Sequence, residues 1–192
     1  GQPTLTAGAP ALAENGMDSP RGVAIDAGGR LWVADTMNNR VLRFDHAALK
    51  PMGGNADAVL GQANFEQKTS VVTAASLVKP TSVAVESRHT GQGWVADRLW
   101  VGDGNNRVLL YNIPVNKPNG GAADKVLGQV NFTNSASALT RSRMYGVTGV
   151  AASGGRLWVC DSVHSRVLRF ENAPTKANGA DADGVLGQSL YT

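Results

Sequence analysis

One unit occurs three times along this chain, and every copy reads Arg-Leu-Trp-Val, then Asp, then Arg-Val-Leu. The copies begin at Arg30, Arg98 and Arg156, so their starts lie 68 and 58 residues apart. Repeats of this length are typical of architectures in which each copy forms one structural unit and neighbouring units share a core. Residues that recur in the same phase are therefore expected to be scaffold, and functional residues have to be sought where the copies differ.

Each copy contains four short runs that favour β-strands. In the first copy these runs are 22–25, 30–34, 40–44 and 59–62, and both other copies match all four. The runs are rich in β-branched and aromatic residues and are bounded by Gly, Asn, Asp and Pro, whereas no stretch has a helical period. The sequence therefore predicts an all-β protein, a β-propeller of four-stranded antiparallel blades with three blades present. The small apolar first run is predicted to be innermost, and the Trp strand is predicted to pack between neighbouring blades.

Composition narrows the class of protein without naming a function. With 42% hydrophobic and 17% charged residues, the 192-residue chain is globular rather than disordered. A net charge of +3 without a Lys/Arg run does not argue for an acidic partner. The single Cys160 excludes an internal disulfide and a Cys-based zinc site, and its place in a strand predicts a small buried thiol. These residues contain no signal peptide and no apolar stretch long enough to span a membrane.

The segments 20–26, 31–35 and 38–41, with their Asp-to-Asn-Asn-Arg element, resemble the NHL repeat family. The resemblance covers essentially the whole chain in three copies, although the third copy has Val163-His164-Ser165 before its Arg. It implies a propeller that usually has six blades, so the three blades present are half of a ring. The long units closed by Val-Leu-Gly-Gln look like a bacterial secreted subgroup, which implies an extracellular or periplasmic location. The expected boundaries are about 1–62, 63–129 and 130–188 for the three blades, with 189–192 beginning a next blade.

An open half ring would leave two apolar flanks, which soluble proteins avoid. We therefore expect further blades to cover them, either from a longer parent chain or from a second copy. Residues 186–192 read Leu-Gly-Gln-Ser-Leu-Tyr-Thr and repeat the motif that starts at Gly1. Such overlapping ends favour a window cut from a longer array.

Two sets of residues recur in every copy and are interpreted as scaffold. A buried Asp–Arg ion pair is predicted to hold the turn between the second and third strands of each blade, and the alternative is a ring of charge around a mouth. The predicted pairs are Asp35 with Arg40, Asp103 with Arg107, and Asp161 with Arg166. The structural aromatic residues are Trp32, Trp100 and Trp158.

No catalytic residue, metal site or cofactor is expected in this chain. His46 and His89 fall in links on one rim and His164 falls on the other, so the three cannot share a metal ion. No nucleophile motif occurs. Two alternatives remain: part of a propeller lyase or hydrolase whose catalytic residues lie in other blades, and an RNA-binding NHL domain. A nucleic-acid partner is less favoured, because only Arg141, Arg143 and Arg166 would form its basic rim.

The copies differ in length at the turn between their first and second strands. The distance from Ile25 to Arg30 is 5 residues, but that from Val85 to Arg98 is 13. The added residues include Trp94, the one Trp outside the repeated motif, and Arg88, His89 and Gln92. They form either a contact site for a protein or small ligand or merely a longer turn that folds back on its blade. We expect a non-enzymatic scaffold for protein or ligand binding, with this segment as the candidate contact site.

Overall fold

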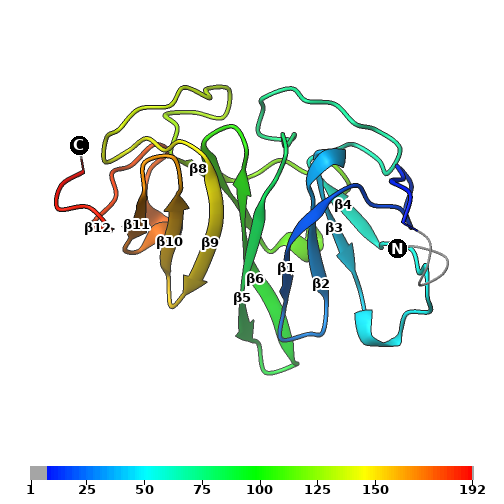
Figure 1. The fold of residues 1–192 in the computed structure, drawn as a ribbon. Coiled ribbons are helices and arrows are strands. Elements are labelled where there is room, and N and C mark those ends of the chain that lie inside the picture. The colour runs from blue at the N-terminus through cyan, green and yellow to red at the C-terminus, as the bar shows by residue number, and fades with distance from the viewer. Residues whose placement is uncertain (1–7, 192) are drawn as a thin grey trace.

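The computed structural model describes residues 8–191, with the side chains of Trp94 and Val95 left out. These residues form three four-stranded antiparallel sheets, one from each sequence copy. The sheets stand side by side in chain order, and the long links between them arch over one rim (Figure 1). The all-β prediction with three propeller blades is therefore confirmed.

Within each blade the strands are ordered as they occur in the sequence. Blade one consists of β1 (Pro20–Ile25), β2 (Leu31–Asp35), β3 (Arg40–Phe44) and β4 (Ala58–Leu60). Blade two consists of β5 (Ser82–His89), β6 (Trp94–Asp103), β7 (Arg107–Asn112) and β8 (Lys125–Leu127). Blade three consists of β9 (Val147–Ser153), β10 (Arg156–Asp161), β11 (Arg166–Phe170) and β12 (Gly184–Leu186). The short 3₁₀ turns are η1 (Thr36–Asn38), η2 (Ala47–Leu49), η3 (Pro114–Asn116) and η4 (Ala173–Thr175).

The fourth strand of each blade is shorter than its sequence run. In blade one β4 ends at Leu60, because Gly61 has a φ of +85°, a left-handed conformation that leaves the strand. Gly128 and Gly187 do the same in the other blades, with φ of +84° and +86°. The Val-Leu-Gly-Gln motif is therefore a strand followed by a turn. In each blade the Gln Nε2–H group donates to a carbonyl in the turn between the second and third strands.

Two of the three hydrophobic clusters lie between neighbouring sheets, and the third lies on blade one around Leu42 and Phe44. Trp32 packs with Leu99 and Tyr111 of blade two, and Trp100 packs in the same way with Leu157 and Phe170 of blade three. The first strands β1, β5 and β9 lie at one edge of each sheet, and β5 contacts both of the others. Small residues at that edge let three blades converge, as the sequence predicted.

Each outer blade exposes one apolar face. On the outward face of blade one, here called the blade-one flank, Val23 and Ile25 are both 66% exposed, whereas the equivalent Val83 is 7% exposed because blade one covers it. The outward face of blade three, the blade-three flank, carries a half-buried Trp158 and an exposed Cys160. The predicted buried thiol is therefore wrong for this chain. Cys160 occupies the position of Ala34, which is buried only because the next blade covers it.

Candidate functional site

The structure places each predicted Arg against the Asp of its own blade. The Nε–H groups of Arg40, Arg107 and Arg166 all donate to the Asp Oδ2 at 2.7 Å, and all six side chains have no exposed surface. In every blade the two residues are directly opposite each other where the second strand ends and the third begins. Because these charged side chains are buried, they cannot contact a ligand at the mouth of the propeller channel.

The remaining N–H groups of each Arg bind the links that run over the rim. In blade two, Arg107 donates to the carbonyls of Thr73 and Ser76, in the link before the blade, and to that of Phe132, in the link after it. Arg40 and Arg166 make the same set of contacts in their own blades. The planar guanidinium has enough donors in fixed directions to serve one carboxylate and several carbonyls together. Each Arg therefore fastens two links to its blade.

Burial and the Arg partner act in opposite directions on the blade-two carboxylate. Burial raises the pKa of Asp103, while the charge and hydrogen bonds of Arg107 oppose that rise. Burial also raises the pKa of the Tyr111 phenol, which lies in the same interior with no hydrogen-bond partner for its hydroxyl within the described residues. Phe44 and Phe170 stand at the equivalent positions, so packing rather than the hydroxyl accounts for an aromatic residue there.

A second repeated pair stabilises the loop between the third and fourth strands. Asp57, Asp124 and Asp183 each accept a backbone N–H at 2.7–2.8 Å and a Lys ammonium at 2.8–2.9 Å. Burial by itself raises the pKa of Asp57, but the Asp45 amide and Lys50 outweigh it, so the pKa lies below its ordinary value of 3.8. The pKa of Asp183 is lowered by Lys176 and the Glu171 amide against the same opposing effect of burial.

This loop should make the fold sensitive to acid. A carboxylate whose pKa is lowered by folding stabilises the protein above its unfolded pKa, and that stabilisation disappears as the pH falls through the folded pKa. The double variant D57N/D183N should therefore be less stable than the wild type at pH 7, and the difference should shrink below pH 3.8. Urea midpoints of both proteins from pH 7 to pH 2.5 measure it. A difference that stays constant over this range would contradict the assignment.

The structure does not bring the histidines together. His46 follows β3 and His89 ends β5 in the hairpin, whereas His164 lies in the β10–β11 turn at the opposite end of its sheet. His164 is not a plain surface residue, because its Nδ1 lies 2.9 Å from Asp161 Oδ2 and it is largely buried. It takes the place of Asn38, whose Nδ2–H donates to Asp35. Within the described part of the chain no three His, Cys, Asp or Glu side chains converge to hold a metal ion.

The three arginines proposed for an RNA-binding rim do not all present their charge to solvent. Arg166 is buried in its ion pair, so it cannot reach a phosphate. Arg141 donates to the Ala182 carbonyl and stacks on Tyr191, and Arg143 donates to the Gln129 side chain. Only Arg141, half exposed, presents much of its charge to solvent.

The candidate contact segment is a β-hairpin that extends β5 and β6 beyond the other first-to-second-strand turns (Figure 1). Its register continues to His89 opposite Trp94, after an irregularity between Glu86 and Ser87. The tip is closed by the Thr90 N–H donating to the Gly93 carbonyl at 2.9 Å, with Gly91 and Gly93 at positive φ. The structure therefore shows a formed hairpin rather than an irregular loop.

The side chains of this hairpin lie at the surface. Arg88 is 55% exposed and its Nε–H donates to Asp97 at 2.6 Å, while His89 and Gln92 are exposed. The His89 Nδ1 accepts the Gly91 N–H. The Trp94 side chain lies outside the described residues, so its predicted exposure stays a prediction. At the base, the Ala27 N–H donates to Ser87 Oγ, which joins the hairpin to blade one.

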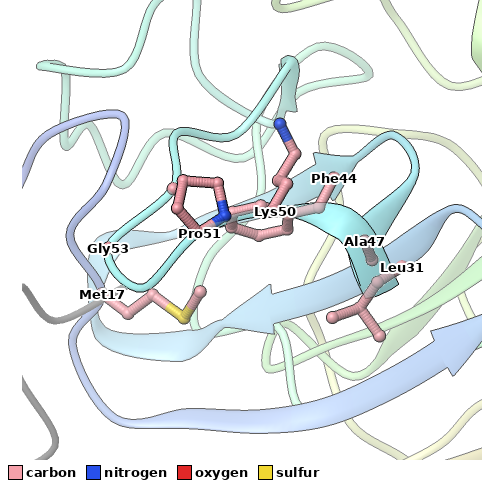
Figure 2. A pocket seen from close by; sticks show the side chains of 8 residues that line it. Met17, Leu31, Phe44, Ala47, Lys50, Pro51 and Gly53 are labelled. Atoms are coloured by element: carbon pink, nitrogen blue, oxygen red, sulfur yellow. The ribbon is translucent and has the colours of Figure 1, made fainter.

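A shallow apolar pocket of about 200 Å³ opens on the blade-one flank. Met17, Leu31 and Phe44 line it together with Lys50 and Pro51 (Figure 2). In blades two and three the residues equivalent to Met17, Leu31 and Phe44 pack in the cluster that contains the Trp of the preceding blade. The pocket is thus lined by residues whose equivalents are buried between blades, and it does not have the convergent polar groups of a ligand site.

Sequence reasoning missed one group of residues that join the blades. The Asn119 Oδ1 accepts the Val59 N–H at 3.0 Å, and the Gly120 N–H donates to the Val59 carbonyl at 3.0 Å. Asn178 and Gly179 bind Val126 in the same way. The signal was present in the phase of Asn-Gly before the repeated Asp, but a tight turn alone accounts for that dipeptide. We call this pair of hydrogen bonds the Asn–Gly clasp.

Three four-stranded blades that bury hydrophobic clusters between them, with buried ion pairs that hold the links, have the arrangement of β-propeller blades. Residues 17–44 match the family model described as the NHL repeat, so the expected resemblance is confirmed there. No curated protein matches the chain significantly in sequence.

The chain is also similar to solved structures. It matches a chain of a nidogen/laminin complex with 17% identity and a TM-score of 0.54, over 94% of this chain and 52% of that one. It matches Kuenenia stuttgartiensis hydrazine synthase with 12% identity and a TM-score of 0.54, over 97% of this chain and 39% of that one. It matches a virginiamycin B lyase from Staphylococcus aureus with 13% identity and a TM-score of 0.43, over 81% and 39%. The first two likenesses show the fold alone, and the chain spans about half or less of the length of these structures.

Among the described residues, no helix is long and apolar enough to cross a membrane.

Proposed function

We propose that this chain is the part of a non-enzymatic β-propeller scaffold that binds a protein or ligand through the β5–β6 hairpin, with further blades covering its two flanks. The observation that carries the proposal is the hairpin itself. Elsewhere the copies repeat the same strands, and the other turns between the first three strands differ by at most one residue in length. Among the described residues, this hairpin extends past those turns with exposed polar side chains. Binding sites are usually built on such extensions of a rigid frame.

The hairpin is also suited to binding because its backbone is already ordered. Cross-strand pairing and the Arg88–Asp97 ion pair fix its shape before a partner arrives. A preformed surface loses less conformational entropy on binding than a flexible loop does. Arg88, His89 and Gln92 then supply a cation, an imidazole and an amide to a polar surface or ligand.

The alternatives gain less support from specific residues. The repeated Asp–Arg pairs are committed to backbone carbonyls. Among the described residues no three His, Cys, Asp or Glu side chains converge, and His164 is committed to the buried Asp161. An RNA surface would require exposed cations, and Arg166 is buried. A lyase or hydrolase would therefore depend on residues outside this chain.

The proposal is tested by trimming the hairpin. Residues 86–97 are replaced by Asp-Ala-Gly-Gly, the turn of blade one, whose Asp26 binds the Trp32 indole N–H as Glu86 binds that of Trp100. Partners bound by the wild type are identified by mass spectrometry and then rebound as purified proteins. We expect the trimmed variant to bind at least about tenfold more weakly, since contact residues of this kind carry most binding energy.

Two controls make this result specific. Substitution of Gln67 with Ala, an exposed residue in a link over the opposite rim, should leave the dissociation constant unchanged. The trimmed variant should keep the wild-type circular dichroism spectrum and melting temperature within a few degrees. Unchanged affinity in the trimmed variant would move the binding site away from the hairpin and contradict the proposal.

A further inference from the structure

The two junctions inside this chain are held by the same hydrogen bonds. In each, the Asn–Gly turn of the later blade binds the backbone of a Val in the fourth strand of the earlier blade, with distances of 3.0–3.1 Å. The Gly cannot be replaced easily, because a Cβ on Gly120 or Gly179 would lie 2.8 Å from the Cα of Ala63 or Val130, in the turn that follows the fourth strand of the earlier blade. The clasp is therefore a direct backbone contact between blades.

A third hydrogen bond crosses each junction in the other direction. The Oδ1 of Asn39 in blade one accepts the Lys79 N–H of blade two at 2.9 Å, and that of Asn106 accepts the Gly146 N–H of blade three at 3.0 Å. Asn39 and Asn106 both have positive φ, at +55° and +59°, which Asn tolerates better than most residues. Both internal junctions thus share these three hydrogen bonds, two of which depend on an Asn side chain.

At the blade-three flank the strand half of the clasp, which is the backbone of the fourth-strand Val, is present. Val185 is equivalent to Val59 and Val126, since each lies opposite a Leu of the third strand. Outside that strand pairing, no hydrogen bond reaches the Val185 backbone within residues 8–191. Ser165, with a φ of +51°, stands where Asn39 and Asn106 stand in the other blades.

At the blade-one flank the turn half of the clasp is incomplete, because it lacks the Asn acceptor. Gly53 keeps the positive φ of the clasp turn, at +69°, but Met52 takes the place of Asn119 and Asn178. A thioether is at best a weak acceptor and cannot replace the amide oxygen that receives the Val N–H. Met52 is instead 70% exposed.

We propose that the blade-three flank takes a blade that presents an Asn–Gly turn, and that a second copy of this chain is not its partner. If blade one of a second copy docked there, Met52 and Ser165 would remove both Asn bonds. Only the Gly53 N–H to the Val185 carbonyl would remain of the three. This inference deepens the proposal that further blades cover the flanks, and it rests on that proposal.

The apolar part of the interface does not decide between these partners. Trp158 and the pocket around Phe44 have the same residue types as the internal junctions. Hydrophobic burial would therefore favour a second copy of this chain and a different blade equally. Leaving backbone groups of Val185 and Ser19 without partners in a closed interface is unfavourable. The Asn–Gly clasp and the third hydrogen bond therefore determine which blade can bind at this flank.

The test restores the missing side chains. In the double variant M52N/S165N a second copy would offer all three hydrogen bonds, and both sites are exposed, so the fold should be unaffected. Sedimentation equilibrium should show a head-to-tail dimer at least about tenfold tighter than any self-association of the wild type, since one net hydrogen bond is worth about fivefold. The control M52L/S165A should match the wild type.

Cys160 provides an independent readout on the flank itself. It is the single thiol of the chain and is exposed, so its alkylation rate should fall with dimer formation in the double variant only. A wild type that already forms a closed dimer with Cys160 protected, or a double variant that associates no more tightly than the control, would overturn the inference.

A second variant tests the clasp within the chain. N178M copies the blade-one residue into an internal junction and should lower the urea midpoint, whereas M52N alone should not. An unchanged midpoint for N178M would also overturn the inference. None of these substitutions lies in the β5–β6 hairpin, so a failure here is distinguishable from a failure of the proposed binding function.

Discussion

Replacing Arg107 with Ala should lower the free energy of unfolding by about 3–5 kcal/mol. The substitution leaves the fully buried Asp103 carboxylate without its partner, which is the costly way to disrupt a buried ion pair. It also removes the donors that serve the carbonyls of Thr73, Ser76 and Phe132. Equilibrium denaturation in urea measures the loss, and both links should become sensitive to protease.

Two further variants separate this effect from a general loss of charge. R107K should recover little, because a single ammonium cannot serve one carboxylate and three carbonyls in the directions that the guanidinium does. R88A breaks an exposed ion pair with Asp97 and should change stability by less than about 1 kcal/mol. A small loss for R107A would mean that the pair does not hold the links.

Replacing Trp100 with Ala should be nearly as damaging, at about 3–5 kcal/mol, because the indole is completely buried between blades two and three. The same substitution at Trp158 should have a clearly smaller effect, although the two positions are equivalent in the sequence. Trp158 lies on the blade-three flank and is only half buried, so less surface is returned to water when it is removed.

Thermal and urea unfolding of W100A and W158A, compared in the same buffer, measure this difference. Trp32 should behave like Trp100, since it is 1% exposed. Equal losses for Trp100 and Trp158 would show that something covers the blade-three flank in solution. Equal and small losses would instead contradict the assignment of the tryptophans as scaffold.

The parts of the fold that repeat were predictable from the sequence. Strands recur in phase, so three copies of Leu-Trp-Val identify the strand that packs between blades, and the Asp–Arg spacing predicts a pair across one turn. The sequence could not show which carbonyls the Arg binds, because these lie 23–34 residues away in links without a recognisable motif. The early end of β4 depends on the left-handed φ of Gly61, which is a backbone property.

Burial at the flanks was not predictable, because burial depends on a neighbour and not on the residue. Cys160 and Ala34 occupy equivalent positions, yet one is exposed and the other is buried. The blade-joining Asn residues were missed for a different reason. Asn-Gly has a sufficient local explanation as a turn, so its contact with the preceding blade cannot be recognised in the sequence of a single copy.

The hydrogen bonds of Arg40, Arg107 and Arg166 also determine where one repeat unit of this protein ends. Each Arg binds a carbonyl 25 residues further along the chain, at Phe65, Phe132 and Tyr191, beyond the fourth strand of its blade. A nascent blade therefore completes its polar interior only after the start of the following link has been synthesised. Gene duplication or recombination that cut directly after Gly-Gln would separate an Arg from one of its acceptors. The smallest unit that can be duplicated with its interactions intact extends past the fourth strand into the following link. The boundaries of this genetic unit therefore differ from those of the structural blade.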